Sequence, residues 1–255
     1  MRRILLICSA VILFAASASA QKTKPWTEWT PKDAQKVLTD SPWSQSQTEV
    51  SDAQSSSGSA ITKTESRNEA QMVGMDLTKQ DSKNQESGEN IGRRNAGASL
   101  NYRISLLSAK PIRQAFIRMI ELQRPEMPAE KVAEIRTFVD RDFGDYVVVT
   151  VNLDGTDKKR LVPAMQEINT ADASVLKTTT YLERKDGKRV ALMDYRAPTQ
   201  DGMGAKFVFP RMLDGKPFID VNSGEMRVYI ELGKTIKLNR RFKVADMVYD
   251  GKLEF

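Results

Sequence analysis

Residues 226–244 read MRVYIELGKTIKLNRRFKV. Apolar and polar side chains alternate in two runs, 226–232 and 235–244, on either side of Gly233-Lys234. Alternation with period two is typical of a strand with one buried and one wet face. A short connection that contains glycine joins two such strands into an antiparallel hairpin. This stretch therefore predicts that the chain is built on an antiparallel sheet.

The same combination of short alternating runs and turn residues recurs through the C-terminal half. Runs 178–184 and 189–195 flank Lys185-Asp186-Gly187-Lys188, runs 206–210 and 217–221 flank Asp214-Gly215, and Asp250-Gly251 turns the last residues. Residues 100–106 also alternate, whereas 146–153 are apolar on nearly both faces, which is typical of a central strand. We expect each flanking pair to form a hairpin of one antiparallel sheet.

Two stretches between these strands have the period of helices. Ile112, Ala115, Phe116, Met119 and Ile120 form one apolar stripe, with Ser108 as the expected N-cap and Pro111 in the first turn. After Pro125, a second helix from Pro128 places Val132, Ile135 and Val139 on one face. A further short helix over 158–168 is possible by its pattern, although Pro163 opposes it. The predicted fold class is α+β: an antiparallel sheet body with a helical hairpin.

The N-terminal region divides into three zones before this body, which spans 99–255. Residues 1–20 combine Arg2 and Arg3, an apolar run and a small-residue cleavage site, the pattern of a secretory signal peptide. Residues 21–43 predict a short helix bracketed by tryptophans. Residues 44–98 are polar and nearly free of aromatic side chains, so we expect a largely disordered or loose segment. We predict an exported protein, periplasmic or extracellular, with no transmembrane segment after signal cleavage.

The amino-acid composition excludes several catalytic mechanisms. The chain of 255 residues has no histidine, and its one cysteine, Cys8, lies within the expected signal, so the mature chain is cysteine-free. Ser-His-Asp and Cys-His sites are therefore excluded, and ordinary zinc sites with them. No phosphate-binding glycine loop or calcium loop is present, and we expect no cofactor and no metal. The net charge of +6, which becomes +4 without Arg2 and Arg3, gives little support for a nucleic-acid partner.

Three acids offer the remaining catalytic chemistry. Asp140, Asp142 and Asp145 follow the second predicted helix and could flank a glycosidic bond or bind a hard cation. Because Arg136 and Arg141 interleave with them, a solvated helix end is the alternative that we favour. Ser174 and Lys177 have the spacing of a lysine-activated serine, but we expect them at the start of a strand rather than on a helix.

Two groups of residues are candidates for binding. Lys234, Lys237, Arg240 and Arg241 could meet an anionic envelope polymer or an acidic protein partner, or could be a solvated strand face. Trp26, Trp29 and Trp43 could stack on sugar rings, or could anchor the N-terminal helix on the main body. For both groups we favour the structural alternative.

Several segments resemble a family of exported bacterial proteins, frequent in acidobacteria, that has no assigned activity. They are WTPKDA (29–34), LTDSPW (38–43), SAKPIRQA (108–115), DYVVVT (145–150) and the stretch 242–255. The resemblance implies a signal peptide and a recurrent architecture, and it transfers no catalytic residue. We therefore expect a non-enzymatic envelope or extracellular binding or structural module. The alternative is a carboxylate-dependent hydrolase that acts on an envelope glycan.

Overall fold

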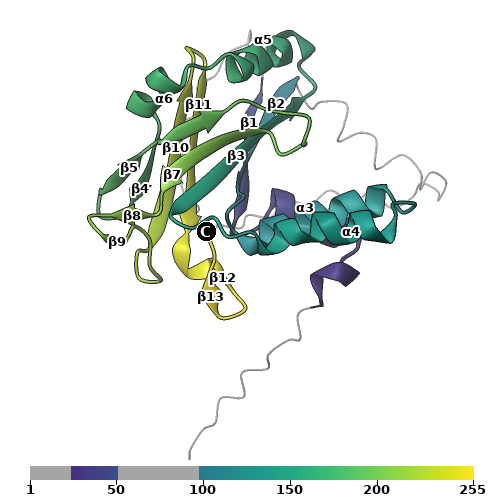
Figure 1. Ribbon diagram of the computed structural model, residues 1–255. Coiled ribbons are helices and arrows are strands. Elements are labelled where there is room, and N and C mark those ends of the chain that lie inside the picture. The colour runs from purple at the N-terminus through teal and green to yellow at the C-terminus, as the bar shows by residue number, and fades with distance from the viewer. Residues whose placement is uncertain (1–23, 51–97) are drawn as a thin grey trace, which may run out of the picture.

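The computed structural model describes residues 24–50 and 98–255, and its fold is α+β, with two antiparallel sheets and a group of helices beside them (Figure 1). The expected signal peptide and residues 51–97 of the polar segment lie outside the described residues. Within the described part, no helix is long and apolar enough to cross a membrane.

The larger sheet, sheet A, has five strands in the order β1-β2-β3-β7-β6. All neighbouring pairs are antiparallel. The strands are β1 (Ser44–Val50), β2 (Ser99–Leu106), β3 (Tyr146–Gly155), β6 (Asp194–Arg196) and β7 (Ala205–Pro210). The central position of β3 confirms the prediction from its apolar sequence, since both of its faces are covered over most of its length.

The smaller sheet, sheet B, has four strands in the order β11-β10-β4-β5. They are β4 (Tyr181–Arg184), β5 (Arg189–Ala191), β10 (Glu225–Leu232) and β11 (Ile236–Lys243). The predicted hairpin at Gly233-Lys234 is confirmed as β10–β11. Two small hairpins, β8 (Met212–Leu213) with β9 (Lys216–Pro217) and β12 (Val248–Tyr249) with β13 (Lys252–Leu253), turn at the predicted Asp-Gly pairs. Asp and Gly both have positive φ there, the conformation of a tight hairpin turn.

The two sheets share one core. Inward-facing side chains of both, such as Phe207 of β7 and Met226 of β10, belong to a single buried apolar cluster. The chain passes from one sheet to the other between β5 and β6. At the opposite edge, Gln45 and Gln47 of β1 donate side-chain hydrogen bonds of 2.7 and 2.8 Å to carbonyl oxygens of β11. The two sheets are thus joined along both edges.

The helices lie in two groups (Figure 1). Helix α5 (Lys158–Asn169) and helix α6 (Ala173–Thr179) lie at one end of the sheets, and α3 (Lys110–Gln123) and α4 (Ala129–Arg136) project sideways as the predicted helical hairpin. The short helix η2 (Thr137–Asp140) continues α4, and η3 (Val244–Asp246) follows β11. At the N-terminus, η1 (Trp26–Glu28) and α1 (Pro31–Thr39) pack against α3. Thr30 and Asp33 form a reciprocal capping box at the start of α1.

Several sequence predictions need correction. The polar segment does not begin at Ser44, because Ser44–Val50 is strand β1. This strand has few apolar side chains and is held mainly by hydrogen bonds. The Ser44 hydroxyl donates to Leu38 O at 2.6 Å, and the backbone of the strand pairs with β2. Run 189–195 divides between the two sheets, and β7 pairs with β3 and β6 rather than with 217–221. Pro163 lies inside α5 on its exposed side, where its missing N–H removes only one helical bond.

Ser108 is not the N-cap of α3. Ala109 occupies that position and offers no side-chain cap, while the Ser108 hydroxyl accepts a hydrogen bond from Val148 N. The carboxylate of Glu254 instead accepts from Lys110 N at 2.9 Å. A negative charge at this position also suits the helix dipole. The distant end of the chain thus completes the start of α3, which a local sequence pattern could not indicate.

Candidate functional site

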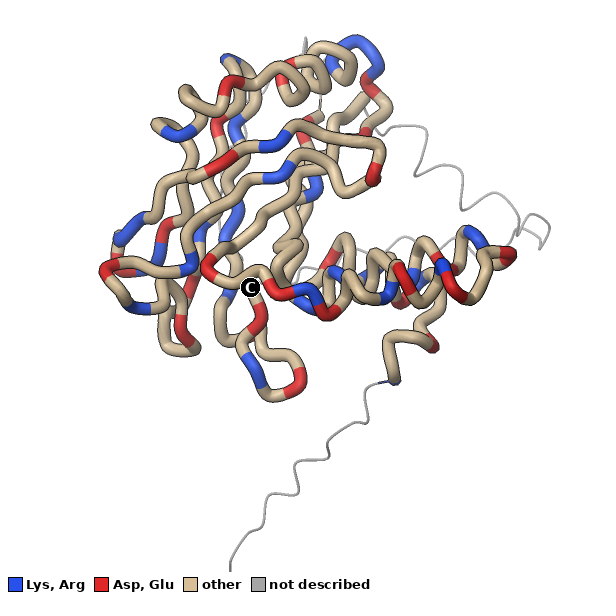
Figure 2. The backbone as a smooth tube through the Cα atoms, viewed as in Figure 1, with Lys and Arg blue, Asp and Glu red and all other residues tan. Residues whose placement is uncertain are grey.

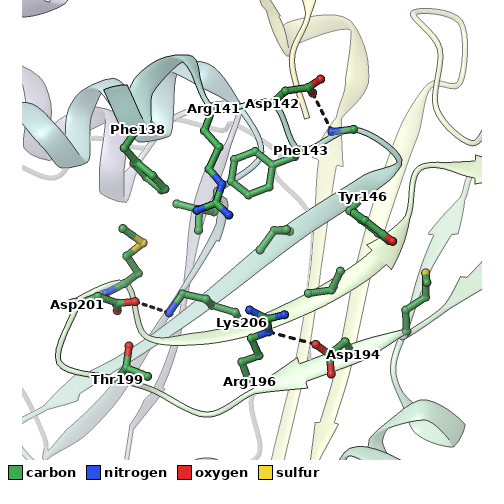
Figure 3. Close-up of a pocket in the computed structure, with 16 residues that line it drawn as sticks. Phe138, Arg141, Asp142, Phe143, Tyr146, Asp194, Arg196, Thr199, Asp201 and Lys206 are labelled. Carbon is green, nitrogen blue, oxygen red and sulfur yellow. Dashed lines mark hydrogen bonds and ion pairs between the residues drawn. The ribbon is translucent and has the colours of Figure 1, made fainter. Parts of the chain in front are cut away.

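A groove with a volume of about 1010 Å³ lies over the outer face of sheet A (Figure 3). Register places Val148 of β3 beside Val208 of β7, and Val208 beside Asp194 of β6. Two residues further along the same strands, Lys206 of β7 lies beside Arg196 of β6. Since alternate residues of a strand face the same side, these side chains form the floor of the groove.

Two loops form the side walls of the groove. The stretch that follows η2 provides Arg141 and Phe143 next to Phe138, and the connection between β6 and β7 provides Asp201 and Met203. The lining residues without charge are mostly aliphatic or aromatic: Leu107, Phe138, Phe143, Gly144, Tyr146, Val148, Met193, Thr199, Met203 and Val208. The groove is therefore an apolar channel with charged groups at its sides, a common composition of small-molecule sites.

Two of the three cations in the groove have acidic partners. Lys206 Nζ lies 2.7 Å from Asp201 Oδ2. The other oxygen of this carboxylate, Oδ1, accepts a hydrogen bond from Met203 N at 2.9 Å. Burial raises the pKa of Asp201, but these hydrogen bonds outweigh it and hold the pKa below 3.8. Arg196 Nε lies 3.2 Å from Asp194, and 73% of the Arg196 side chain is exposed, so water screens this pair.

Arg141 has no acidic partner among the residues that the structure describes. Its guanidinium carbon lies 5.8 Å from the centre of the Phe143 ring, and its side chain points into the groove with Phe138 and Phe143 on either side (Figure 3). The neighbouring Asp142 borders the groove, but its carboxylate accepts from Gly144 N at 2.8 Å and points away from Arg141. Arg141 is thus an exposed cation held by a ring contact and open to a ligand.

A second cavity of about 440 Å³ lies behind the same loop and shares Arg141, Asp142, Phe143 and Gly144 with the groove. The other two arginines of this cavity, Arg113 and Arg211, serve the fold. Arg113 is buried and donates to Val139 O at 2.9 Å and to the carbonyl oxygens of Leu107 and Ser108. Burial lowers the pKa of Arg113 and of Arg211, but both groups stay charged at neutral pH.

The three predicted acids do not converge on one point. Asp140 forms an ion pair of 2.9 Å with Lys110, and Asp142 is engaged with Gly144 N. The backbone carbonyl of Asp145 accepts from Arg211 N. In residues 24–50 and 98–255, no group of three or more acidic side chains could hold a metal ion.

The predicted basic patch is divided between two faces of β11. Lys237 and Arg241 point outward and pair with Glu231 at 3.2 Å and Glu225 at 3.3 Å. Arg240 lies between the buried Leu238 and Phe242 on the opposite face. Lys234 lies in the exposed hairpin turn. Figure 2 shows basic and acidic residues interspersed over sheet B, which supports a solvated face rather than one positive surface.

The tryptophans serve packing in the structure. Trp43 is 8% exposed, and its Nε1 donates to Glu254 O at 2.8 Å. Trp26 is half-buried under Arg136, whose guanidinium carbon lies 5.7 Å from the ring centre. Trp29 O accepts from Arg118 Nε at 2.9 Å. The rings of Trp26 and Trp43 thus contact α4 and the C-terminal segment, and the backbone of Trp29 contacts α3. Together these contacts join the N-terminal segment to the rest of the structure.

Ser174 and Lys177 lie on a helix, α6, and not at the start of a strand. The spacing is therefore helical, contrary to the expectation. The Ser174 hydroxyl bonds to the helix-capping carboxylate of Asp172 at 2.7 Å, and Lys177 is exposed. A serine in this position completes a helix N-terminus rather than an assembled nucleophile.

Sequence reasoning missed the groove because its residues come from three separate stretches: Leu107, 138–148 and 193–208. Arg141 was noted only as a neighbour of the acids, and Lys206, Arg196 and Met193 carried no pattern of their own. One signal was present: residues 146–149 are apolar on both faces of the strand, which indicates that Val148 on the outer face is covered.

No protein-family model, no curated protein and no solved structure matches this chain significantly. The resemblance of its segments to exported bacterial proteins therefore stays a prediction. Function has to be inferred from the site itself.

Proposed function

We propose that this chain is an exported, non-enzymatic binding module and that the groove over sheet A is its binding site. The observation that carries the proposal is the combination of an aliphatic floor, Val148 and Val208, with the guanidinium of Arg141, which has no acidic partner in the described part of the chain. An apolar groove of this size with a few placed charges favours a ligand over bulk water. The signal-like pattern of 1–20 supports an envelope or extracellular location.

The test of the site uses the neutral fluorescent probe N-phenyl-1-naphthylamine. We expect the wild-type protein to bind the probe and Val208→Trp, which fills the floor, to bind it at least tenfold more weakly. Val162→Trp on α5 is the matched control, because Val162 is 66% exposed and lies outside the groove. Equal binding by all three folded proteins would place the probe elsewhere and contradict the proposal.

Export has its own test. We expect the protein recovered from the periplasm or medium of a bacterial host to begin at Gln21. Full-length protein retained in the cytoplasm would contradict this part of the proposal, and it would leave the groove experiment unaffected.

A carboxylate-dependent glycan hydrolase is the alternative function. The observation in its favour is that Asp142 lines both the groove and the second cavity. Release of reducing ends from purified envelope glycans, lost in Asp142→Asn but kept in Asp246→Asn on η3, would favour this alternative. No release by the wild-type protein would count against it.

A further inference from the structure

We propose, on the basis of the proposed function above, that the ligand of the groove is an unbranched apolar monocarboxylate of the fatty-acid class. Its carboxylate would bind Arg141, and its chain would lie along the floor formed by β3, β7 and β6. Three features of the groove favour this class: a guanidinium that has no acidic partner within residues 24–50 and 98–255, two cations that already have acids, and an aliphatic floor.

The head group follows from Arg141. A guanidinium presents a planar fork of donors that matches a carboxylate in a bidentate pair. The contact with the Phe143 ring restrains the side chain without occupying its N–H groups. The two acids adjacent in sequence do not compete, because Asp140 is paired with Lys110 and Asp142 accepts from Gly144 N. The site therefore offers one oriented cation to one anion.

The charge of the ligand follows from the other two cations. Lys206 is bound to Asp201, and the Lys206 side chain is 16% exposed, so its release for a ligand would break a partly buried pair. Arg196 lies 3.2 Å from Asp194, so these two side chains together add no net positive charge at that point. A phosphate dianion would need a second free cation. The balance of charges favours a monoanion.

The aliphatic chain of the ligand is inferred from the residues of the groove floor. Val148 and Val208 are directly paired neighbours, and Met193 and Met203 line the same groove. Methionine and valine side chains provide an aliphatic surface without hydrogen-bond demands. Burial of each additional CH₂ group on such a surface should strengthen binding roughly fourfold.

The ring of Phe143 does not favour a sugar. Sugar stacking needs an open ring face, but guanidinium groups of Arg113 and Arg141 lie 5.2 and 5.8 Å from the centre of the Phe143 ring. The acids Asp194 and Asp201, which could accept from sugar hydroxyls, are both bound to cations. An acyl chain uses the surface that remains.

The experiment measures displacement of N-phenyl-1-naphthylamine from the full protein by dodecanoate, dodecanol, dodecylamine and dodecyl phosphate at pH 7, below their micelle-forming concentrations. We expect dodecanoate to bind at least tenfold more tightly than dodecanol or dodecylamine and more tightly than dodecyl phosphate. Decanoate should bind about sixteenfold more weakly than dodecanoate, because it lacks two CH₂ groups. Arg141→Gln should remove the preference for dodecanoate and leave dodecanol binding unchanged.

Arg241→Gln is the matched control, since Arg241 is an exposed arginine on sheet B outside the groove. Arg141→Lys keeps the charge but not the fork, and we expect it to keep part of the preference. Equal affinity for dodecanoate and dodecanol, with probe binding still lost in Val208→Trp, would overturn the ligand class and leave the proposed function standing. Tighter binding of dodecyl phosphate would overturn the monocarboxylate. Probe binding that Val208→Trp does not affect would overturn the proposed function itself.

Discussion

The outer faces of the two sheets carry similar residues in opposite arrangements. On sheet B, Glu183 accepts hydrogen bonds from both Arg189 and Arg227. The rings of Tyr181 and Tyr229 stack 5.0 Å apart, and the same two arginines lie 4.2 and 5.2 Å from the ring centres. Each of these groups satisfies another, so this face has little left to offer a ligand.

On sheet A, two cations are paired with acids, and Arg141 lies apart from these pairs. Arg141 enters the groove from the loop after η2, whereas Asp194 and Asp201 come from β6 and the connection after it and are bound to other cations. The comparison shows that composition alone does not separate a binding surface from a solvated one. The two faces differ in whether oppositely charged groups lie on neighbouring strands, where they pair, or on different walls of a groove.

The largest effect should come from Arg113, which lies beneath the loop that carries Arg141. Arg113→Met should lower the free energy of unfolding by about 3 kcal/mol, because three buried carbonyl oxygens lose their donor. Urea unfolding followed by circular dichroism measures the change. Arg189→Met on sheet B is the control, with an expected loss of about 0.5 kcal/mol from an exposed pair. Similar losses in the two variants would show that buried and exposed arginines are not distinguished as we describe.

Asp201→Asn should convert part of the groove into a more basic site. Lys206 loses its acidic partner in this variant, so the preference for dodecanoate over dodecyl phosphate should decrease by about tenfold, which corresponds to roughly 1.4 kcal/mol. Competition against N-phenyl-1-naphthylamine measures both affinities. Asp194→Asn should change the preference less, since Arg196 is already solvated. An unchanged preference in Asp201→Asn would mean that Lys206 does not face the ligand.

On sheet B, the ion pair between Glu183 and Arg227 should show a smaller coupling energy that depends on salt. A double-mutant cycle with Glu183→Gln and Arg227→Met should give a coupling energy of about 0.5–1 kcal/mol that decreases in 1 M NaCl. Thermal unfolding of the four proteins provides the values. A coupling near zero at low salt would mean that this face is no better satisfied than the groove.

The smallest effect is the acid dependence of the same network. Burial raises the pKa of Glu183, but hydrogen bonds from Arg189 and Arg227 outweigh it, so the pKa in the fold lies below 4.5. A lowered pKa gives stability above the unfolded value, and this stability is lost as pH falls through the folded value. The difference in melting temperature between wild type and Glu183→Gln should therefore be present at pH 7 and decrease below about pH 4. A difference that grows in acid would contradict this direction.

The fold was predictable where local patterns decide it. Gly233-Lys234 between alternating runs specifies the β10–β11 hairpin, and Thr30 with Asp33 specifies the start of α1. β1 was not predictable, because its polar side chains gain their partners from β2 and β11. The cap of α3 by Glu254 depends on a contact across 144 positions. The groove was hidden for the same reason, since Arg141 and Val208 meet only through tertiary structure.

The most direct test of the central claim is to locate the bound ligand by photo-crosslinking. A twelve-carbon fatty acid with a diazirine on its chain is irradiated with the full protein, and the labelled peptides are identified by mass spectrometry. We predict labels on the stretches that contain Val148, Met193 and Val208, and their loss in the presence of excess dodecanoate. Labels concentrated on the outer face of sheet B, within Glu225–Leu232 and Ile236–Lys243, would contradict the account.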